Sequence, residues 1–388
     1  MQLVAYGAQD IYLTGNPQIT FFKVVYRRHT NFSMESIEQT WNGNQTANGR
    51  CTATISRNGD LVHKCYLAST LNAQNALNGP AQDLSTITCE IGGQQIDKHY
   101  GEWLEIWSEL SEPNPGGQQC GTKYQMMSGI GAGVTCNTGV TASDLSDDAA
   151  ALHNKSRFFG VPDLESDVVS TPLMFWFCRN PGLALPLIAL QYHEVKIIVE
   201  FASSLSGSTD YSLWVDYIYL DTDERRRFAQ VSHEYLIEQI QRQSESTSTK
   251  FTLNFNHPVK ELIWNGGWGS GANTAFTSWE SGDTWKLTLN GHERFAARDT
   301  RYFTRTQVWQ HHTGYGGFQA ATQAAGQRLA VYSFALKPEE HQPSGTCNFS
   351  RIDNAVLETS RTTPANIFAV NYNVLRIMSG MGGLAYSN

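Results

Sequence analysis

The sequence has little charge. Only 16% of its 388 residues are charged, against about a quarter in an ordinary soluble domain. Acidic residues outnumber basic ones by 36 to 28, which gives a net charge of −8. This balance excludes a global basic field of the kind that recruits nucleic acid, so we expect no direct nucleic-acid contact. The low charge and the 33 glycines favour a β protein with many turns, or a protein whose surface is largely covered by neighbouring molecules.

Long apolar runs and targeting signals are also missing. No apolar run approaches the roughly 20 residues that a membrane helix needs, so we expect no membrane insertion. The first nine residues lack the charged flank and apolar centre of a secretory signal. The seven cysteines are odd in number and include no C-x-x-C pair. We therefore expect reduced, buried thiols and folding in the cytosol.

The stretch from Trp214 to Gln243 predicts a strand, a short charged helix and a second strand. Apolar side chains occupy both faces of the first strand, and Asp221 is suited to capping the helix with Glu224 three residues later. Asp223 and Glu224 are spaced for ion pairs with Arg227. We interpret this stretch as a stiff joint between two β modules, with its apolar residues packed between them. The joint residues are Tyr217, Tyr219, Leu220, Asp221, Asp223, Glu224, Arg225, Arg226, Arg227 and Phe228.

The rest of the chain is typical of an all-β protein with few helices. One helix is expected from its apolar spacing, over 96–110, and Asn290-Gly291 predicts a tight hairpin turn. Short segments of alternating polarity predict strands over 19–26, 32–41, 61–71, 86–91, 195–201, 251–255, 285–289, 332–336 and 368–377. The predicted organisation is an N-terminal arm (1–18), a first module (19–222) with a surface insertion over about 111–154, and a second module (223–388).

Motifs that carry chemistry do not assemble. The segment 116–123 has the reverse of the Lys-Ser/Thr order of a phosphate loop, and the glycine-rich segment 266–271 lacks the spacing of a nucleophile elbow. His311 and His312 would point to opposite faces of a strand, and Glu339-Glu340-His341 sits between prolines as a polar loop. We expect no catalytic residue, cofactor or metal, and therefore no enzyme.

Several segments resemble a known protein family in their exact amino-acid sequence. In order along the chain, six blocks resemble the major capsid protein family of nucleocytoplasmic large DNA viruses. These blocks are Asp10–Phe22, Ile91–Trp103, Asn180–Val195, His257–Trp264, Leu336–Asp353 and Asn371–Tyr386.

This resemblance implies a fold of two tandem eight-stranded antiparallel jelly rolls with a few short helices. It implies a structural protein that forms homotrimeric, pseudo-hexagonal capsomers tiling an icosahedral viral shell. The implied partners are further copies of the chain, through trimer and trimer–trimer contacts, and minor capsid proteins beneath a shell that can overlie an inner membrane. The implied location is the outer capsid of the virion, assembled at viral factories in the host cytoplasm.

A carbohydrate-binding or carbohydrate-cleaving jelly roll is the alternative. Trp264, Trp268 and Trp279 would be its exposed sugar platforms, and Glu339 or Glu340 its acids. The two hypotheses differ in a simple observable: the capsid protein forms a stable trimer, whereas the alternative predicts a monomer with affinity for glycans.

Overall fold

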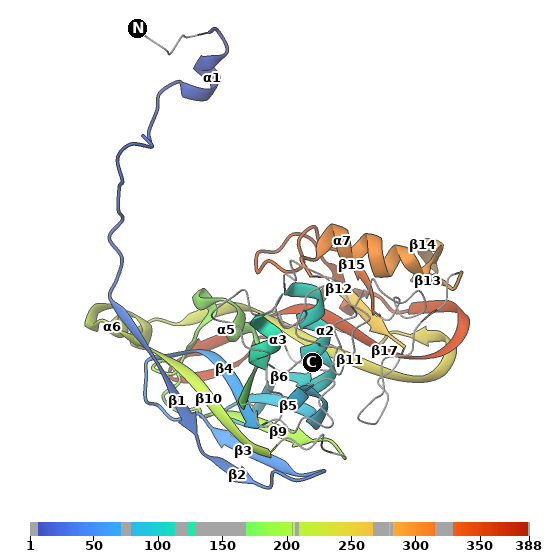
Figure 1. Cartoon of the computed structure of the whole chain (residues 1–388), viewed down its shortest axis with the longest axis horizontal. Coiled ribbons are helices and arrows are strands. Elements are labelled where there is room, and N and C mark those ends of the chain that lie inside the picture. Colours follow the sequence, from blue (N-terminus) through green and yellow to red (C-terminus); the bar gives the residue numbers. More distant parts are fainter. Residues whose placement is uncertain are drawn as a thin grey trace, which may run out of the picture.

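The computed structural model describes residues 7–70, 79–112, 123–128, 168–203, 205, 209–266, 279, 282–314 and 329–386. The strands of the described part form three sheets, and every strand pair in them is antiparallel. Figure 1 shows two β modules side by side, the first in blue to green and the second in yellow to red, with helix α2 between them. This is the all-β architecture of two modules that the sequence predicts.

The first module packs two five-stranded sheets face to face around one apolar core. Alternate residues of the central strands point into this core, which includes Val62, Leu67, Ile197 and Val215. One sheet has the order β1 (Phe32–Gln39), β10 (Thr209–Leu220), β4 (Leu61–Thr70) and β7 (Val168–Pro172), with β8 (Leu185–Pro186) beside β4; the other has the order β2 (Trp41–Gly43), β3 (Arg50–Thr54), β9 (Val195–Phe201), β5 (Leu84–Ile91) and β6 (Gln94–Tyr100).

The second module is built on two long strands that pair along most of their length. Its aromatic core contains Phe251, Trp264, Trp285 and Phe303, all fully buried. The long pair is β11 (His233–Thr252) and β17 (Ala355–Met378), and the other strands are β12 (Pro258–Asn265), β13 (Thr284–Leu289), β14 (His292–Asp299), β15 (Leu329–Ser333), β16 (Cys347–Asn348) and β18 (Met381–Leu384).

The helices are short and lie at the ends of strands. The longest described helix is α2, which begins directly after β6. The described helical segments are α1 (Asp10–Thr14), α2 (Gly101–Ser111), α3 (Lys123–Ser128), α5 (Trp176–Arg179), α6 (Thr222–Gln230) and α7 (Gln307–His311), the 3-10 turns η2 (Gly79–Asp83), η4 (Pro181–Leu183) and η6 (Phe349–Arg351), and the π turn η5 (Tyr302–Thr306).

Several sequence predictions about these elements are wrong. The strands expected over 251–255 and 332–336 end early, at Thr252 and Ser333. Residues 19–26 form no strand; they belong to an exposed arm that leaves the body before β1 begins at Phe32 (Figure 1). The helix expected over 96–110 begins only at Gly101, because residues 94–100 pair with β5 as a strand. The apolar spacing of Ile96 and Tyr100 fits either structure, and the neighbouring strand decides between them.

The predicted hairpin at Asn290-Gly291 is confirmed. Both residues have positive φ angles, 49° and 77°, as a tight turn between β13 and β14 requires. The insertion expected over 111–154 lies outside the described residues except for Ser111, Glu112 and α3.

Candidate functional site at the interface between the jelly rolls

Helix α6 joins the two modules in sequence, and it is anchored to the first one. The Oδ1 atom of Asp221 accepts a hydrogen bond from the backbone N–H of Thr222 at 2.8 Å, so the predicted cap is present. Arg225 forms an ion pair with the nearly buried Asp60 at 2.9 Å. The expected ion pairs of Arg227 with Asp223 and Glu224 are not among the ion pairs of the described residues, and Arg225 makes this helix's ion pair instead. The other Oδ of Asp60 accepts the backbone N–H of Leu220 at 2.9 Å, which fixes the end of β10.

The apolar residues of the predicted joint lie mainly on the first module. Tyr217 is buried in its core and donates a hydrogen bond to the carbonyl oxygen of Ser56 at 2.7 Å. Tyr219 packs against the same core, and Leu220 and Phe228 pack on a small cluster formed by Leu61, Ala184 and Ile218.

Phe228 also reaches the second module. Its ring stacks on His233, the first residue of β11, with the centroids 5.3 Å apart. The carbonyl oxygen of Phe228 lies 2.9 Å from Nε2 of the same histidine. The Phe228 side chain is only half-buried, and Asp223, Arg226 and Arg227 are exposed. The joint helix therefore offers little buried area with which to fix the angle between the modules.

A larger contact between the modules is made by α2. Trp103 is fully buried, stacks on Trp107 at 5.4 Å and packs 5.5 Å from the ring of Phe368 on β17. These rings belong to one apolar cluster drawn from both modules: Trp103, Ile106, Trp107 and Leu110 from α2, with Ile240, Ile263, Val308, Leu329, Val331, Phe368 and Val370 from the second module. The burial of several large side chains here, each worth roughly 1.5–3 kcal/mol, makes α2 a strong connection.

Glu102, in the first turn of α2, is a buried carboxylate whose described partners come from the second module. Oε1 accepts hydrogen bonds from the side-chain amides of Asn265 at 2.6 Å and Asn366 at 3.0 Å. Oε2 forms an ion pair with Arg242 at 3.2 Å. Burial raises the pKa of Glu102, and the positive charge of Arg242 opposes that rise. The Arg242 guanidinium also lies 4.6 Å from the ring centroid of Tyr100, on the first module.

A second buried ionic group links α5 of the first module to the second module. Glu238 on β11 forms ion pairs with the fully buried Lys260 at 2.7 Å and with Arg179 at 2.9 Å. Burial opposes the charged form of Glu238, but Lys260, His341 and Arg179 together hold its pKa down to about 2. The Arg179 guanidinium also lies 4.4 Å from the ring centroid of Trp107, so this network is continuous with the α2 cluster.

A third group closes the far end of α2. His312, just after α7, is held between Glu261 and Glu339, with each ring nitrogen 3.0 Å from a carboxylate oxygen. Burial would lower its pKa, but the two carboxylates raise it to about 9. The next residue, Thr313, donates a hydrogen bond to the carbonyl oxygen of Ser111 at the end of α2, at 2.9 Å. His311 and His312 thus sit at a helix end rather than on the expected strand.

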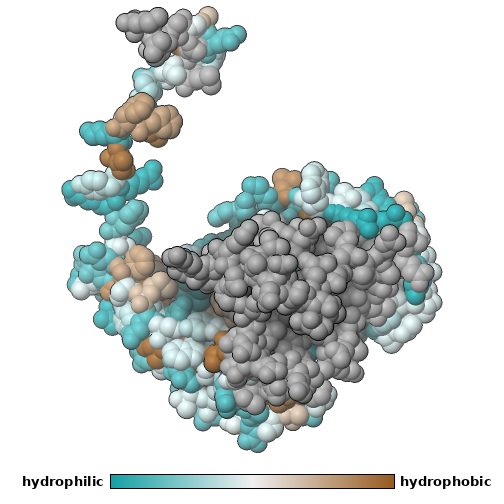
Figure 2. Space-filling view, in the orientation of Figure 1, coloured by the Kyte–Doolittle hydropathy of each residue, from teal (hydrophilic) through white to brown (hydrophobic). Residues whose placement is uncertain are grey.

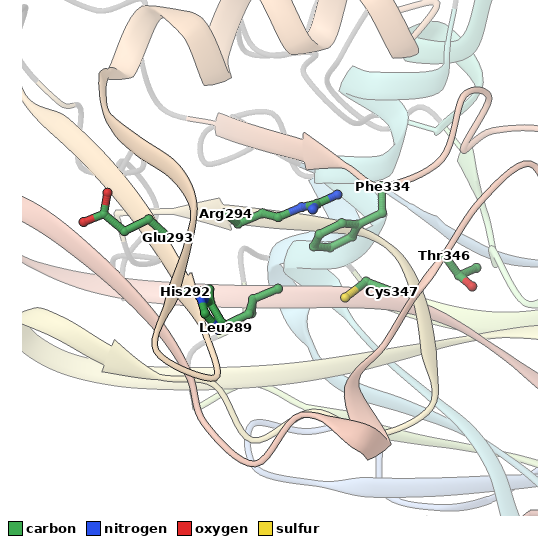
Figure 3. Close-up of a pocket in the computed structure, with 7 residues that line it drawn as sticks. All are labelled: Leu289, His292, Glu293, Arg294, Phe334, Thr346 and Cys347. Carbon is green, nitrogen blue, oxygen red and sulfur yellow. The ribbon is translucent and has the colours of Figure 1, made fainter.

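A shallow pocket of about 350 Å³ lies at the hairpin of β13 and β14. In Figure 3, Arg294 and Phe334 lie together above Cys347, while the carboxylate of Glu293 points away from them. Burial raises the pKa of the Cys347 thiol, which disfavours a reactive thiolate. Within the described residues no group of three or more potential ligands could hold a metal ion, and no helix is long and apolar enough to cross a membrane.

The residues proposed for the carbohydrate alternative do not form a sugar site. The prediction that Trp264 and Trp279 are exposed platforms is wrong, because both are buried in the aromatic core of the second module. Trp268 lies outside the described residues. Glu339 accepts hydrogen bonds from Thr313 and binds His312, and Glu340 pairs with Lys337 on the surface.

Comparison with known proteins defines the class first. A chain in the quasi-atomic model of the PBCV-1 virus capsid matches this structure with a TM-score of 0.72 at 35% identity, covering 95% of this chain and 100% of that chain. The Faustovirus major capsid protein matches with a TM-score of 0.65 at 13% identity, covering 96% and 94% of the two chains, which supports the fold alone. The fold is that of a double jelly-roll viral capsid protein.

Sequence comparison then gives the family. A family model described as "Major capsid protein N-terminus" matches residues 20–221, and one described as "Large eukaryotic DNA virus major capsid protein" matches residues 224–383. The major capsid protein of Pyramimonas orientalis virus is 53% identical over 419 aligned residues, and that of Paramecium bursaria Chlorella virus 1 is 41% identical over 473; each match covers 100% of this chain and 99% of the relative. The chain belongs to the family of major capsid proteins of large eukaryotic DNA viruses, and its role is structural.

Proposed function

We propose that the chain assembles as a homotrimer whose six jelly rolls form a pseudo-hexagonal capsomer, and that these capsomers tile an icosahedral shell. The observation that carries this proposal is the α2 contact. It joins two similar antiparallel modules through a buried apolar cluster and the buried carboxylates of Glu102 and Glu238. Two jelly rolls fixed side by side in one chain turn threefold symmetry into a hexagonal outline, which can pack without gaps.

We propose further copies of the chain and minor capsid proteins beneath the shell as the partners, with no direct contact to nucleic acid and no membrane insertion. The net charge of −8 supports the first exclusion. Assembly would take place in the host cytoplasm, consistent with free thiols at Cys51, Cys65, Cys89, Cys178 and Cys347. We also propose that the two modules divide between residues 222 and 223; the arm, expected over 1–18, extends in the structure to the residue before β1 at Phe32.

The test of the trimer is direct. Light scattering coupled to size-exclusion chromatography should give three times the chain mass, 43.2 kDa each, at micromolar protein across moderate salt. Electron microscopy of the same fraction should show particles with a hexagonal outline. A monomer under these conditions, or affinity for a glycan array without a trimer, would refute the proposal.

The joint formed by Tyr217 to Phe228 is proposed to carry the chain between the modules, while α2 keeps them in register. Replacing Asp223 to Arg226 with Gly-Ser-Gly-Ser removes the Arg225–Asp60 ion pair and breaks α6. Both modules should still fold, and the yield of particles should fall because the joint helps to set the angle required for tiling. Unchanged thermal unfolding with a normal yield of particles would show that the joint is only a tether.

A further inference from the structure

The arm before β1 is an apolar segment that no described part of its own chain covers. From Ile19 to Tyr26, six large hydrophobic residues are between 79% and 98% exposed: Ile19, Phe21, Phe22, Val24, Val25 and Tyr26. Figure 2 shows brown apolar side chains along the arm, which projects well away from the body. Apolar residues occur at both odd and even positions, as in a strand covered on two faces. Such a segment is built to be buried against a partner.

The arm is basic, and the body is acidic. Between Ile11 and Asn31 the chain has Lys23, Arg27 and Arg28 and no acidic residue. From Phe32 onward it has 25 of the 28 Lys and Arg residues but 35 of the 36 Asp and Glu residues. The arm is therefore complementary in charge to the body of a second copy of this chain.

An edge suited to the arm is present on the first module. β1 is the terminal strand of its sheet and pairs with β10 on one side; no described strand pairs with its other side. Phe32 is 64% and Met34 49% exposed on this strand, and its acidic residues Glu35 and Glu38 are also exposed. The strand thus offers an edge with no described strand partner, apolar contacts and negative charge in one place, features that an added strand would use.

We propose that residues 19–26 of one subunit add as a strand to the outer edge of β1 in a second copy of the chain, so that the arm ties neighbouring subunits together. This inference rests on the proposed function, because it requires assembled copies. A lipid surface fits the arm less well, since residues 19–26 form no helix or strand that would satisfy their backbone N–H and C=O groups inside a bilayer. The thirteen residues from Ile19 to Asn31 span up to about 43 Å when extended, enough to reach a neighbouring subunit.

The test uses the full chain in two tagged forms. One form carries Val24→Cys and the other Ser33→Cys; both are exposed positions. The two forms are co-expressed, and the purified assembly is treated with a short flexible bismaleimide. We expect a crosslinked product that carries both tags. Trp309→Cys, at a residue 81% exposed on α7, replaces Ser33→Cys as the matched control and should yield no product above that of the unsubstituted chain.

A chain with both cysteines separates pairing between subunits from pairing within one. The inference is overturned if the doubly substituted chain gives an internal crosslink within one monomer while the mixture of singly substituted chains gives no product with both tags. That result would place the arm on its own β1. The inference would also be overturned if the crosslink between chains is absent and the arm instead binds the chain to phosphatidylserine vesicles, so that the two sediment together.

A binding readout follows from the apolar side chains. Phe22→Ser combined with Val24→Ser should weaken association of the subunits at least tenfold, a change of about 1.4 kcal/mol, as measured by sedimentation at falling concentration. Trp309→Ser is the matched exposed control and should leave association unchanged. A wild-type trimer that shows neither the crosslink nor this loss refutes the role of the arm and leaves the capsomer proposal intact; a monomeric wild-type chain refutes the capsomer proposal itself.

Discussion

Replacing Glu102 with alanine tests whether α2 holds the two jelly rolls together. The carboxylate is 5% exposed, and its described hydrogen bonds and ion pair reach Asn265, Asn366 and Arg242 across the interface. Its removal leaves two buried amides without their acceptor and one guanidinium without its counter-ion. Each unsatisfied buried amide costs about 1–3 kcal/mol, and removal of one member of a buried ion pair costs about 3–5 kcal/mol.

We expect a loss of about 3–5 kcal/mol in the free energy of unfolding. The cost of the unsatisfied amides and the cost of the broken ion pair describe the same lost contacts, so they are not added together. At about 1.2 °C per kcal/mol for a chain of 388 residues, the melting temperature falls by roughly 4–6 °C. Scanning calorimetry should also show the single transition broadening or splitting, since the second module loses part of its contact with the first.

Glu234→Ala is the matched control. Glu234 also pairs with an arginine, Arg376, but the two side chains are 58% and 52% exposed. An exposed pair contributes at most about 1 kcal/mol. If Glu102→Ala costs no more than Glu234→Ala, or if the calorimetric transition keeps its shape, the reasoning that places the main connection at α2 is wrong.

Three further predictions concern the same interface. The pKa of His312 is raised from 6.5 to about 9 in the folded protein, so its contribution to stability is complete below pH 6.5 and is lost as the pH rises through 9. Urea titrations should show the free energy of unfolding decline by up to about 3 kcal/mol over this range. The decline should be absent in His312→Gln and retained in His292→Gln, a control at an exposed histidine. The pKa of Glu238 is lowered from 4.5 to about 2, so its contribution is complete above pH 4.5 and is lost as the pH falls toward 2; an acid unfolding curve for Glu238→Gln that keeps the wild-type slope would contradict this. Phe228→Ala should lower the free energy of unfolding by only about 1–2 kcal/mol, since the ring is half-buried. Trp103→Ala should lower it by about 3–5 kcal/mol, since that ring is fully buried. Equal losses in denaturant unfolding would contradict the conclusion that α2 contributes more to the interface than the joint does.

The alternating segments of the sequence were enough to predict strands such as β9 and the hairpin at Asn290-Gly291. A strand with one buried face must alternate, and a two-residue turn with positive φ angles favours Asn-Gly. The cap at Asp221 was predictable for the same reason, because its hydrogen bond is made within one turn of helix. The family was also readable in the sequence, since its six characteristic blocks run the length of the chain.

The interface could not be predicted in this way. Glu102 looks like an ordinary acidic residue in the first turn of a helix, and its partners Asn265 and Asn366 lie 163 and 264 residues away. The apolar stripe of α2 was visible, but a stripe does not specify which sheet will cover it. His312 was judged from the wrong local structure, and its two carboxylate partners meet it only after folding.

The sequence by itself therefore determined the elements whose physics is local: alternating strands, tight turns, a helix cap and an acidic, weakly charged composition. The tertiary structure decided three things that depend on distant partners. It left residues 19–26 as an arm that pairs with no described strand, placed Trp264 in a core rather than on a surface, and made α2 a major contact between the modules. Burial and pairing are properties of neighbours, and these neighbours lie far apart in the chain.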